Sequence, residues 1–310
     1  MSEDRPRLTV GLQNFGDVPA PAGDPARGWR VLVDLARQAD EAGVDGVVVV
    51  DHVVMGRNTQ EYAWGTFPQP PEGPWLEPLT VLAAMGAVTE RLRLATGILI
   101  APLRPAALLA KTVATLDQLT GGRIDLGVGV GWQREEFDAV GLDFARRGRM
   151  LTDTIAACRA LWRDVPASFS SETVSFEDTF CTPLPVQDPL PIWFSGVLHA
   201  RNLDRIVRLG DGWIPIMGAT VDDIRDGVSL LREQLDAAGR DPAALRVRAP
   251  LVVARGDDGK VDLDATMASV PELVAAGATE VQANVRQSPA GYDDPATAFA
   301  DLVAAFRRHI

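Results

Sequence analysis

Residues 90–111 read ERLRLATGILIAPLRPAALLAK and contain one strand, one loop and the start of one helix. The run LRLATGI at 92–98 is apolar enough for a strand with both faces buried, and a helical pattern follows over about 105–119. Gly97 falls where this strand should end. A strand followed directly by an amphipathic helix is the unit of a parallel α/β fold.

The same unit recurs along the whole chain. Strands are predicted at 8–15, 46–52, 92–98, 123–129, 191–196, 211–216, 245–254 and 279–285, and helices at 28–42, 76–89, 105–119, 133–163, 199–209, 221–238, 264–276 and 295–308. Eight buried strands alternating with helices predict a TIM (β/α)8 barrel that forms one domain over residues 1–310. A doubly wound nucleotide-binding sheet is the alternative, but no GxGxxG opens a helix after the first strand.

Two long stretches interrupt this alternation. Residues 53–75 follow the second strand, and residues 164–190 follow the fourth strand and its helix. Loops of this length commonly form lids or binding walls. We expect a short hairpin within the second stretch.

Composition limits the classes of partner. The chain has 310 residues, of which 46% are hydrophobic and 23% charged, and its net charge is −12. This net negative charge argues against a general nucleic-acid or anionic-membrane surface. No apolar run reaches the roughly 18 residues of a membrane span, so a cytoplasmic location is expected.

The two cysteines predict neither a disulfide framework nor a zinc site. Cys158 and Cys181 stand alone, without a CxxC or a Cys/His cluster. We expect buried thiols and no metal.

In a TIM barrel the chemistry lies at the carboxyl ends of the strands. The residues expected there are mostly apolar or aromatic: Asn14, Phe15, Asp51, His52, Gly97, Ile98, Gly129 to Trp132, Ser195 to Val197, Ile214 to Ile216, Ala254 and Asn284 to Arg286. Such a set suits a large planar ligand better than glycoside hydrolysis, which needs two facing carboxylates.

Residues 119–162, LTGGRIDLGVGVGWQREEFDAVGLDFARRGRMLTDTIAACRALW, closely resemble the bacterial-luciferase-like superfamily, in particular its coenzyme F420-dependent oxidoreductases. The DH at 51–52, TGILIAPLRPAALLAK at 96–111 and PIWFSG at 191–196 resemble the same family. The resemblance runs from about residue 8 to 302 and implies a barrel that binds F420 or, alternatively, FMN.

The resemblance also implies a bulge at the end of the third strand, with a non-prolyl cis peptide bond between Gly97 and Ile98 that contacts the middle ring of the cofactor. From the residues alone, a glycine that merely turns the chain is the competing interpretation.

His52 is the only histidine at a predicted strand end and is the candidate catalytic residue, as a proton donor or acceptor. The alternative is a supporting histidine paired with Asp51 or a backbone carbonyl. Asp51 is expected to orient its neighbours or to accept a hydrogen bond from the cofactor ring.

The fourth strand end offers Gly129 and Gly131 for close approach to the cofactor and Trp132 as a wall. Glucose-6-phosphate-oxidising relatives carry a glutamate at the position of Trp132, so sugar-phosphate oxidation is not expected. Glu135 and Glu136 begin a helix, where solvated acidic residues are common.

Ser195, Gly196 and Val197 precede a helix, and the resemblance assigns the cofactor phosphate to this loop, with Arg201 as a supplementary charge. An ordinary loop is the alternative. Phe15, Trp64 and Ile216 are expected to line the substrate pocket; the aromatic residues of 53–75 could equally pack on the barrel rim.

The first functional hypothesis is hydride transfer between C5 of F420 and a small organic substrate. The alternatives are an FMN-dependent monooxygenase and a non-catalytic flavin-binding protein. The resemblance further implies a homodimer formed through helices early in the barrel.

Overall fold

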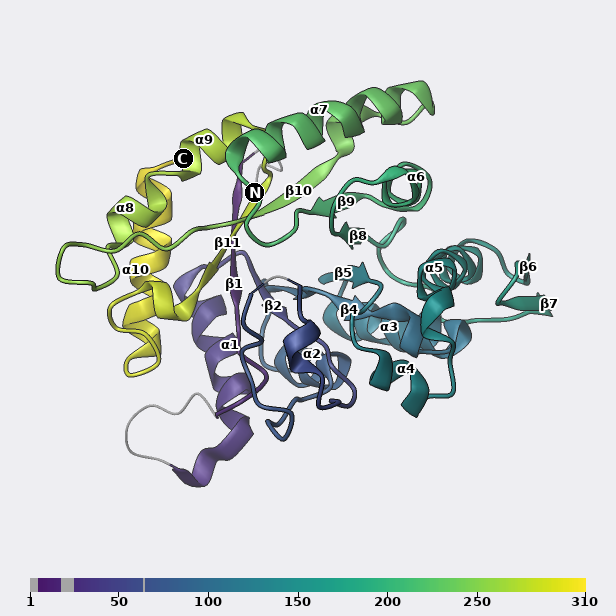
Figure 1. Cartoon of the computed structure of the whole chain (residues 1–310), viewed down its shortest axis with the longest axis horizontal. Coiled ribbons are helices and arrows are strands. Elements are labelled where there is room, and N and C mark those ends of the chain that lie inside the picture. Colours follow the sequence, from purple (N-terminus) through teal and green to yellow (C-terminus); the bar gives the residue numbers. More distant parts are fainter. Residues whose placement is uncertain (1–4, 18–24, 64) are drawn as a thin grey trace.

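Eight parallel strands close into a barrel, as the sequence predicts (Figure 1). The computed structural model describes residues 5–17, 25–63 and 65–310 of the chain. Around the barrel the hydrogen-bonded order is β1, β2, β3 with β4, β5, β8, β9, β10 and β11, and β11 pairs again with β1.

The barrel strands are β1 (Arg7–Gly11), β2 (Gly46–Val49), β3 (Arg93–Thr96), β4 (Leu99–Ile100), β5 (Ile124–Gly129), β8 (Ile192–Ser195), β9 (Gly212–Ile214), β10 (Arg246–Pro250) and β11 (Glu280–Asn284). The α-helices are α1 (Val31–Ala42), α2 (Pro78–Gly86), α3 (Ala106–Thr120), α4 (Arg134–Ala139), α5 (Arg147–Arg163), α6 (Ala200–Leu209), α7 (Val221–Ala237), α8 (Leu263–Met267), α9 (Val270–Ala275) and α10 (Pro295–Arg308).

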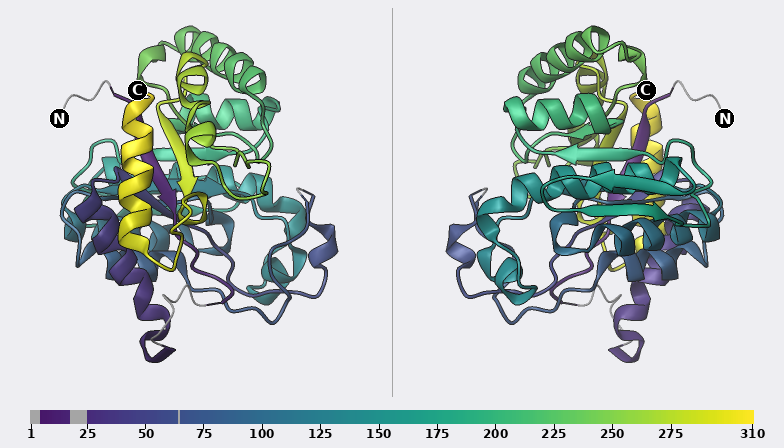
Figure 2. Two further views of the ribbon diagram at one scale, coloured as in Figure 1. Left: turned by 90° about the vertical axis from the view of Figure 1, so that its left-hand side faces the viewer. Right: turned by 90° about the vertical axis from the view of Figure 1, so that its right-hand side faces the viewer.

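The helices bury one apolar face against the strands. In α1 the buried residues include Val31, Leu35 and Ala39, one turn apart, and Gly43 ends the helix in the left-handed conformation at φ 84°. Figure 2 shows α10 along the outside of the barrel, where it contacts α1. The strand residues between these helices and the barrel axis are almost fully buried.

The third strand carries the expected bulge. Ala95 faces Asp125 and Leu99 faces Val128, so four steps along the third strand oppose three along β5. The extra residue divides the strand into β3 and β4, and the Gly97–Ile98 peptide bond is cis, which confirms the prediction.

Three features differ from the predicted boundaries. The helix expected at 133–163 is α4, a 3-10 turn η4 (Phe144–Arg146) and α5. The helix expected at 264–276 is α8 and α9. Strands end two to four residues earlier than several of the apolar runs, because those last residues form the rim of the barrel.

The stretch at 164–190 contains the expected hairpin. Strands β6 (Ala167–Ser170) and β7 (Ser175–Thr179) pair antiparallel, and they lie at the edge of the molecule beyond α5 (Figure 1). Residues 53–75 form a loop with one 3-10 turn, η2 (Thr59–Glu61), in its described part. Cys158 and Cys181 are both buried free thiols, as expected.

The amino ends of the strands carry buried charges. Arg93 on β3 bonds Asp125 on β5 at 2.5 and 2.7 Å, and Arg248 on β10 bonds Glu280 on β11 at 2.8 Å. This polar layer closes the end of the barrel opposite the candidate site. Among the described helices, none combines the length and apolar character needed to cross a bilayer.

Candidate active site

A buried histidine–glutamate pair lies at the carboxyl end of the barrel. His52 follows β2, and its Nδ1 lies 3.0 Å from Oε2 of Glu136 on α4. Oε1 of Glu136 accepts a hydrogen bond from the backbone N–H of Val53 at 2.9 Å. The Glu136 side chain is 0% exposed and that of His52 is 8% exposed, so the pair is shielded from solvent.

The location of Glu136 corrects the expectation that both helix-start glutamates are solvated. Of the two alternative partners named for His52, Asp51 was wrong, since the carboxylate beside the histidine comes from Glu136. Glu136 stands next to Phe137, which is fully buried, and this neighbour is the one sequence signal that this turn of α4 faces the protein interior.

Asp51 holds the loop that follows the third strand. Its carboxylate accepts hydrogen bonds from the Ile100 backbone N–H at 2.8 Å and from Arg104 at 2.7 and 3.1 Å. Arg104 also bonds Glu77, the N-cap of α2, at 2.7 Å. These contacts agree with an orienting role for Asp51; a bond from Asp51 to a cofactor ring stays a prediction.

Aromatic rings surround His52. The centroids of Phe67, Trp75 and Trp132 lie 5.5, 4.6 and 6.0 Å from its ring, each in an edge-on arrangement. Phe15 stacks on Trp75 at 4.3 Å. The structure therefore brings the predicted residues Phe15, His52 and Trp132 into one cluster, whereas Trp64 lies outside the described residues.

Helix α4 fastens the loop that follows His52. The Gln133 side chain accepts a bond from Gly56 N–H at 2.9 Å and donates one to Gly56 C=O at 3.3 Å. Glu135 accepts a bond from Asn58. Sequence reasoning missed Gln133 and the bond of Glu135, because hydrogen bonds to a distant loop leave no periodic signal.

The glycines on and just after β5, the fourth strand predicted from the sequence, make room for the bulge between β3 and β4. A Cβ on Gly127 would lie 2.1 Å from the Thr96 carbonyl oxygen, and one on Gly129 would lie 2.8 Å from the Ile98 side chain. Gly131 would meet Ile100 at 2.7 Å. Packing against the third strand thus explains these glycines, whereas their predicted contact with a cofactor stays a prediction.

The loop after β8 uses part of its backbone in hydrogen bonds to β9 of the barrel. Gly196 N–H donates to Ile214 C=O at 3.0 Å, and the Trp213 indole donates to Gly196 C=O at 2.9 Å. The Gly196 amide is therefore engaged, and the predicted phosphate contact rests on Ser195 and Val197. Arg201 is exposed.

A pocket of about 430 Å³ brings together three of the predicted residues, Gly196, Val197 and Ile216. Its wall is mostly apolar, with Trp213, Met217 and Leu230, and its charged lining residues are Asp223 and Asp226. The acidic rim suits a neutral or apolar group better than an anion.

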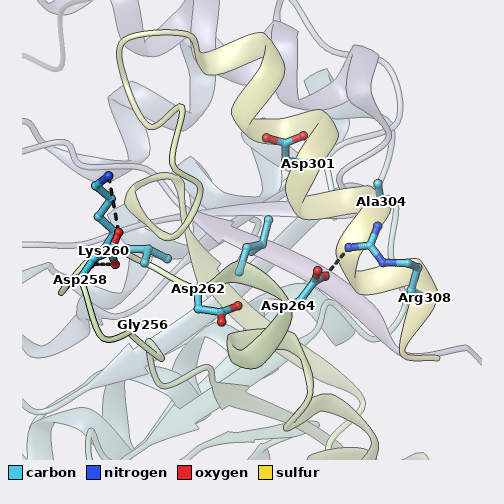
Figure 3. Close-up of a pocket in the computed structure, with 10 residues that line it drawn as sticks. Gly256, Asp258, Lys260, Asp262, Asp264, Asp301, Ala304 and Arg308 are labelled. Atoms are coloured by element: carbon cyan, nitrogen blue, oxygen red, sulfur yellow. Dashed lines mark hydrogen bonds and ion pairs between the residues drawn. The ribbon is translucent and has the colours of Figure 1, made fainter.

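A second pocket, of about 410 Å³, lies between residues 256–264 and α10 and contains none of the predicted site residues. Figure 3 shows Arg308 pointing toward Asp264, with which it forms an ion pair, and Lys260 beside Asp258 at 3.5 Å. Its acidic side chains are thus partly neutralised, and the candidate active site remains at the barrel mouth.

Together these features define a TIM-barrel protein with a buried histidine–glutamate pair under an aromatic wall and a bulged third strand. Residues 10–306 match the family model described as luciferase-like monooxygenase, and the chain belongs to this family.

Two relatives illustrate its place in the family. The chain is 39% identical over 166 residues to the uncharacterized protein Mb0978c of Mycobacterium bovis, a match that covers 54% of this chain and 58% of that protein. It is 34% identical over 236 residues to an FMNH2-dependent dimethylsulfone monooxygenase of Pseudomonas putida, covering 73% of this chain and 63% of that enzyme. The matched regions span less than two thirds of either relative's length.

Solved structures show the same fold. An F420-dependent secondary alcohol dehydrogenase in complex with an F420-acetone adduct superposes with a TM-score of 0.77, at 17% identity over 98% of this chain and 99% of that one. The monooxygenase RslO1 from Streptomyces bottropensis gives 0.75 at 20% identity, with 98% and 99% covered.

Proposed function

We propose that this protein is a luciferase-like oxidoreductase that binds a flavin at the barrel mouth and acts as an FMN-dependent monooxygenase. Two relatives above 30% identity, from Pseudomonas putida and Pseudomonas fluorescens, are FMNH2-dependent. The F420-dependent structure shares only 17% identity, so its likeness concerns the fold. The comparisons thus favour FMN over the F420-dependent hydride transfer expected from the sequence.

The residues at the mouth fit a flat, largely apolar ring. Ile98 is partly exposed there, and Phe15, Phe67, Trp75 and Trp132 are partly exposed aromatic side chains. The Nε1 atom of Trp75 is buried without a hydrogen-bond partner among the described residues. A buried donor of this kind fits a ligand with a polar edge, since such groups seldom stay unpaired.

When bound, reduced FMN supplies the electrons for the reaction of O2 with the substrate. The chain's own contribution is to bind, to exclude water and to handle a proton. Because the Glu136 carboxylate accepts from Nδ1 of His52, the Nδ1–H tautomer is favoured and Nε2 is left as the proton acceptor. His52 is therefore the group we assign to proton transfer.

The buried His52–Glu136 pair at the barrel mouth is the observation that carries the assigned proton transfer, and the FMNH2-dependent relatives support the choice of cofactor. The test is to titrate the purified protein with reduced FMN and with F420, and to follow O2 consumption with dimethylsulfone as the first substrate probe. We expect binding of reduced FMN and substrate-dependent O2 uptake. Binding of F420 without FMN would support hydride transfer instead, and binding without any turnover would indicate a carrier.

The variant His52→Ala tests the assigned proton transfer. We expect cofactor affinity within a few-fold of wild type and turnover lowered by about a hundredfold, the range of general acid–base groups. His199→Ala, at the N-cap of α6, is the matched control. Unchanged turnover in His52→Ala would leave His52 with a packing role only.

We also propose a homodimer formed through α2 and α3. Helix α3 exposes Leu108 and Leu119, at 59 and 76%, and Val88 is exposed just after the end of α2. Large exposed apolar side chains mark interfaces when they cluster. Sedimentation equilibrium should show a dimer for wild type and a monomer for Leu108→Arg/Leu119→Arg. A monomeric wild type would contradict this proposal.

A further inference from the structure

Two arginines from different helices lie over one aromatic ring near the barrel mouth. The guanidinium carbons of Arg134, the first residue of α4, and Arg147, the first residue of α5, lie 4.8 and 3.9 Å from the centroid of Phe144. A guanidinium is attracted to the face of an aromatic ring. Phe144 thus holds two positive charges close to each other.

The structure shows no ion pair between either of these two charges and a described carboxylate. Among the described residues, neither Arg134 nor Arg147 forms an ion pair, whereas the neighbouring Arg146 and Arg149 both pair with Glu172, at 2.7 and 3.2 Å. Burial, followed by the nearby charge of Arg134, lowers the pKa of Arg147. Two like charges held together without a counter-charge favour the binding of an anion.

Arg147 also has an unused donor. Its Nη1 donates to the Phe144 carbonyl at 3.0 Å, while its Nε is buried and makes no hydrogen bond within the described part of the chain. Arg134 is exposed. The pair therefore offers one guanidinium anchored to the Phe144 carbonyl and one exposed guanidinium, and a guanidinium can bind an oxyanion through two N–H groups.

The site shares helix α4 with the candidate active site, but on another face, because residues two apart on a helix point about 200° apart and Glu136 is buried whereas Arg134 is exposed. Arg134 comes two residues after Trp132, whose ring is edge-on to His52, and on the same helix as Glu136.

We propose that Arg134 and Arg147 form an anion-binding site that takes a phosphate group. The same chemistry could come from the phosphate end of FMN or from an anionic group of the substrate. The first source rests on the proposed function; the site itself does not.

The experiment compares Arg134→Gln/Arg147→Gln with the control Arg163→Gln/Arg208→Gln. The control removes the same charge from α5 and α6, but from exposed arginines that are paired with Asp164 and Asp204. Calorimetry measures the affinity of each protein for inorganic phosphate, FMN and riboflavin, which lacks the phosphate.

We expect the site variant to bind inorganic phosphate at least about tenfold more weakly than wild type, because charge-assisted hydrogen bonds are lost, while the control keeps its affinity. A parallel loss for FMN but not for riboflavin assigns the site to the cofactor phosphate. Loss for inorganic phosphate alone assigns it to a substrate anion. Phosphate affinity that is equal in all three proteins, or absent from wild type, overturns the proposal, even if FMN binds and turns over.

Discussion

At Glu136, one carboxylate decides which nitrogen of His52 carries a hydrogen. In Glu136→Gln the amide can still accept from Val53 N–H, but its NH2 group then faces Nδ1 of His52, which favours the opposite tautomer. We expect turnover to fall by about a hundredfold or more, as when a carboxylate that orients a catalytic histidine is replaced by an amide. Cofactor affinity should change little.

Two measurements separate this effect from simple damage. Nitrogen-15 correlation spectra should show His52 changing from the Nδ1–H to the Nε2–H form, and Glu136→Gln/His52→Ala should be no slower than His52→Ala alone. Glu135→Gln, which alters a bond to Asn58 instead, is the control. An unchanged tautomer together with wild-type turnover would remove Glu136 from the mechanism.

The contrast between Glu135 and Glu136 shows where sequence reasoning stops at this scale. The two residues have the same chemistry and helix position, yet the exposed fraction is 0% only for Glu136. Successive helix residues point about 100° apart. The burial of Glu135 and of Glu136 therefore depends on how α4 is rotated against the loop after β2. The predicted strand end was sufficient to place His52 at the barrel mouth. Its partner Glu136 comes from a helix distant in sequence and did not follow from any local pattern.

At the scale of the element, the bulged third strand packs closely against its neighbours at glycine positions, where a side chain would not fit. A Cβ on Gly97 would lie 2.3 Å from Cγ1 of Val48, which is buried in β2. Gly97→Ala should therefore destabilise the protein by about 1–3 kcal/mol, as overpacking does. Val48→Ala removes the obstructing methyl group, so Gly97→Ala/Val48→Ala should be more stable than the sum of the two single changes predicts, as measured by urea unfolding.

Gly127→Ala is the comparison for that cycle. Its Cβ would meet the backbone oxygen of Thr96 at 2.1 Å, which no side-chain substitution can move, so Val48→Ala should give no rescue. Equal rescue at both positions would show that the barrel relaxes generally. The apolar runs predicted this strand and the family resemblance implied its bulge, but the fit between Gly97, Gly127 and their neighbours depends on register, which is set only when three strands pair.

At the scale of the whole molecule, the two ends of the barrel differ in role. Buried ion pairs lie at the amino ends of the strands, and the candidate active site lies at the carboxyl ends. Alternating strands and helices were sufficient to predict the closed barrel, because each buried strand needs cover on both faces. The ion pairs at the amino ends were not predicted, since Arg93, Asp125, Arg248 and Glu280 look like interruptions in apolar runs. Buried charges of this kind are tolerated as ion pairs. Removing one partner lowers the stability, because the other charge is then buried without its partner.

The pair Arg93–Asp125 makes a prediction about acid stability. Burial alone would raise the pKa of Asp125, but the charge and hydrogen bonds of Arg93 outweigh it, and the net pKa is lowered. Because the folded-state pKa lies below the unfolded value of about 4, the pair stabilises the protein fully above that pH and loses its contribution as the pH falls through the folded-state pKa.

Asp125→Asn should accordingly cost about 3–5 kcal/mol at pH 7, because it removes the hydrogen-bonded carboxylate of the mostly buried Arg93 and leaves only the charges of Glu280 and Asp117 near it. The difference in unfolding free energy from wild type should hold between pH 7 and 5 and shrink below pH 4, as wild type itself loses the pair. Urea midpoints across this range measure it, with Asp204→Asn, an exposed partner of Arg208, as control. A difference that stays constant down to pH 3 would mean that Asp125 acts through packing and not through its charge.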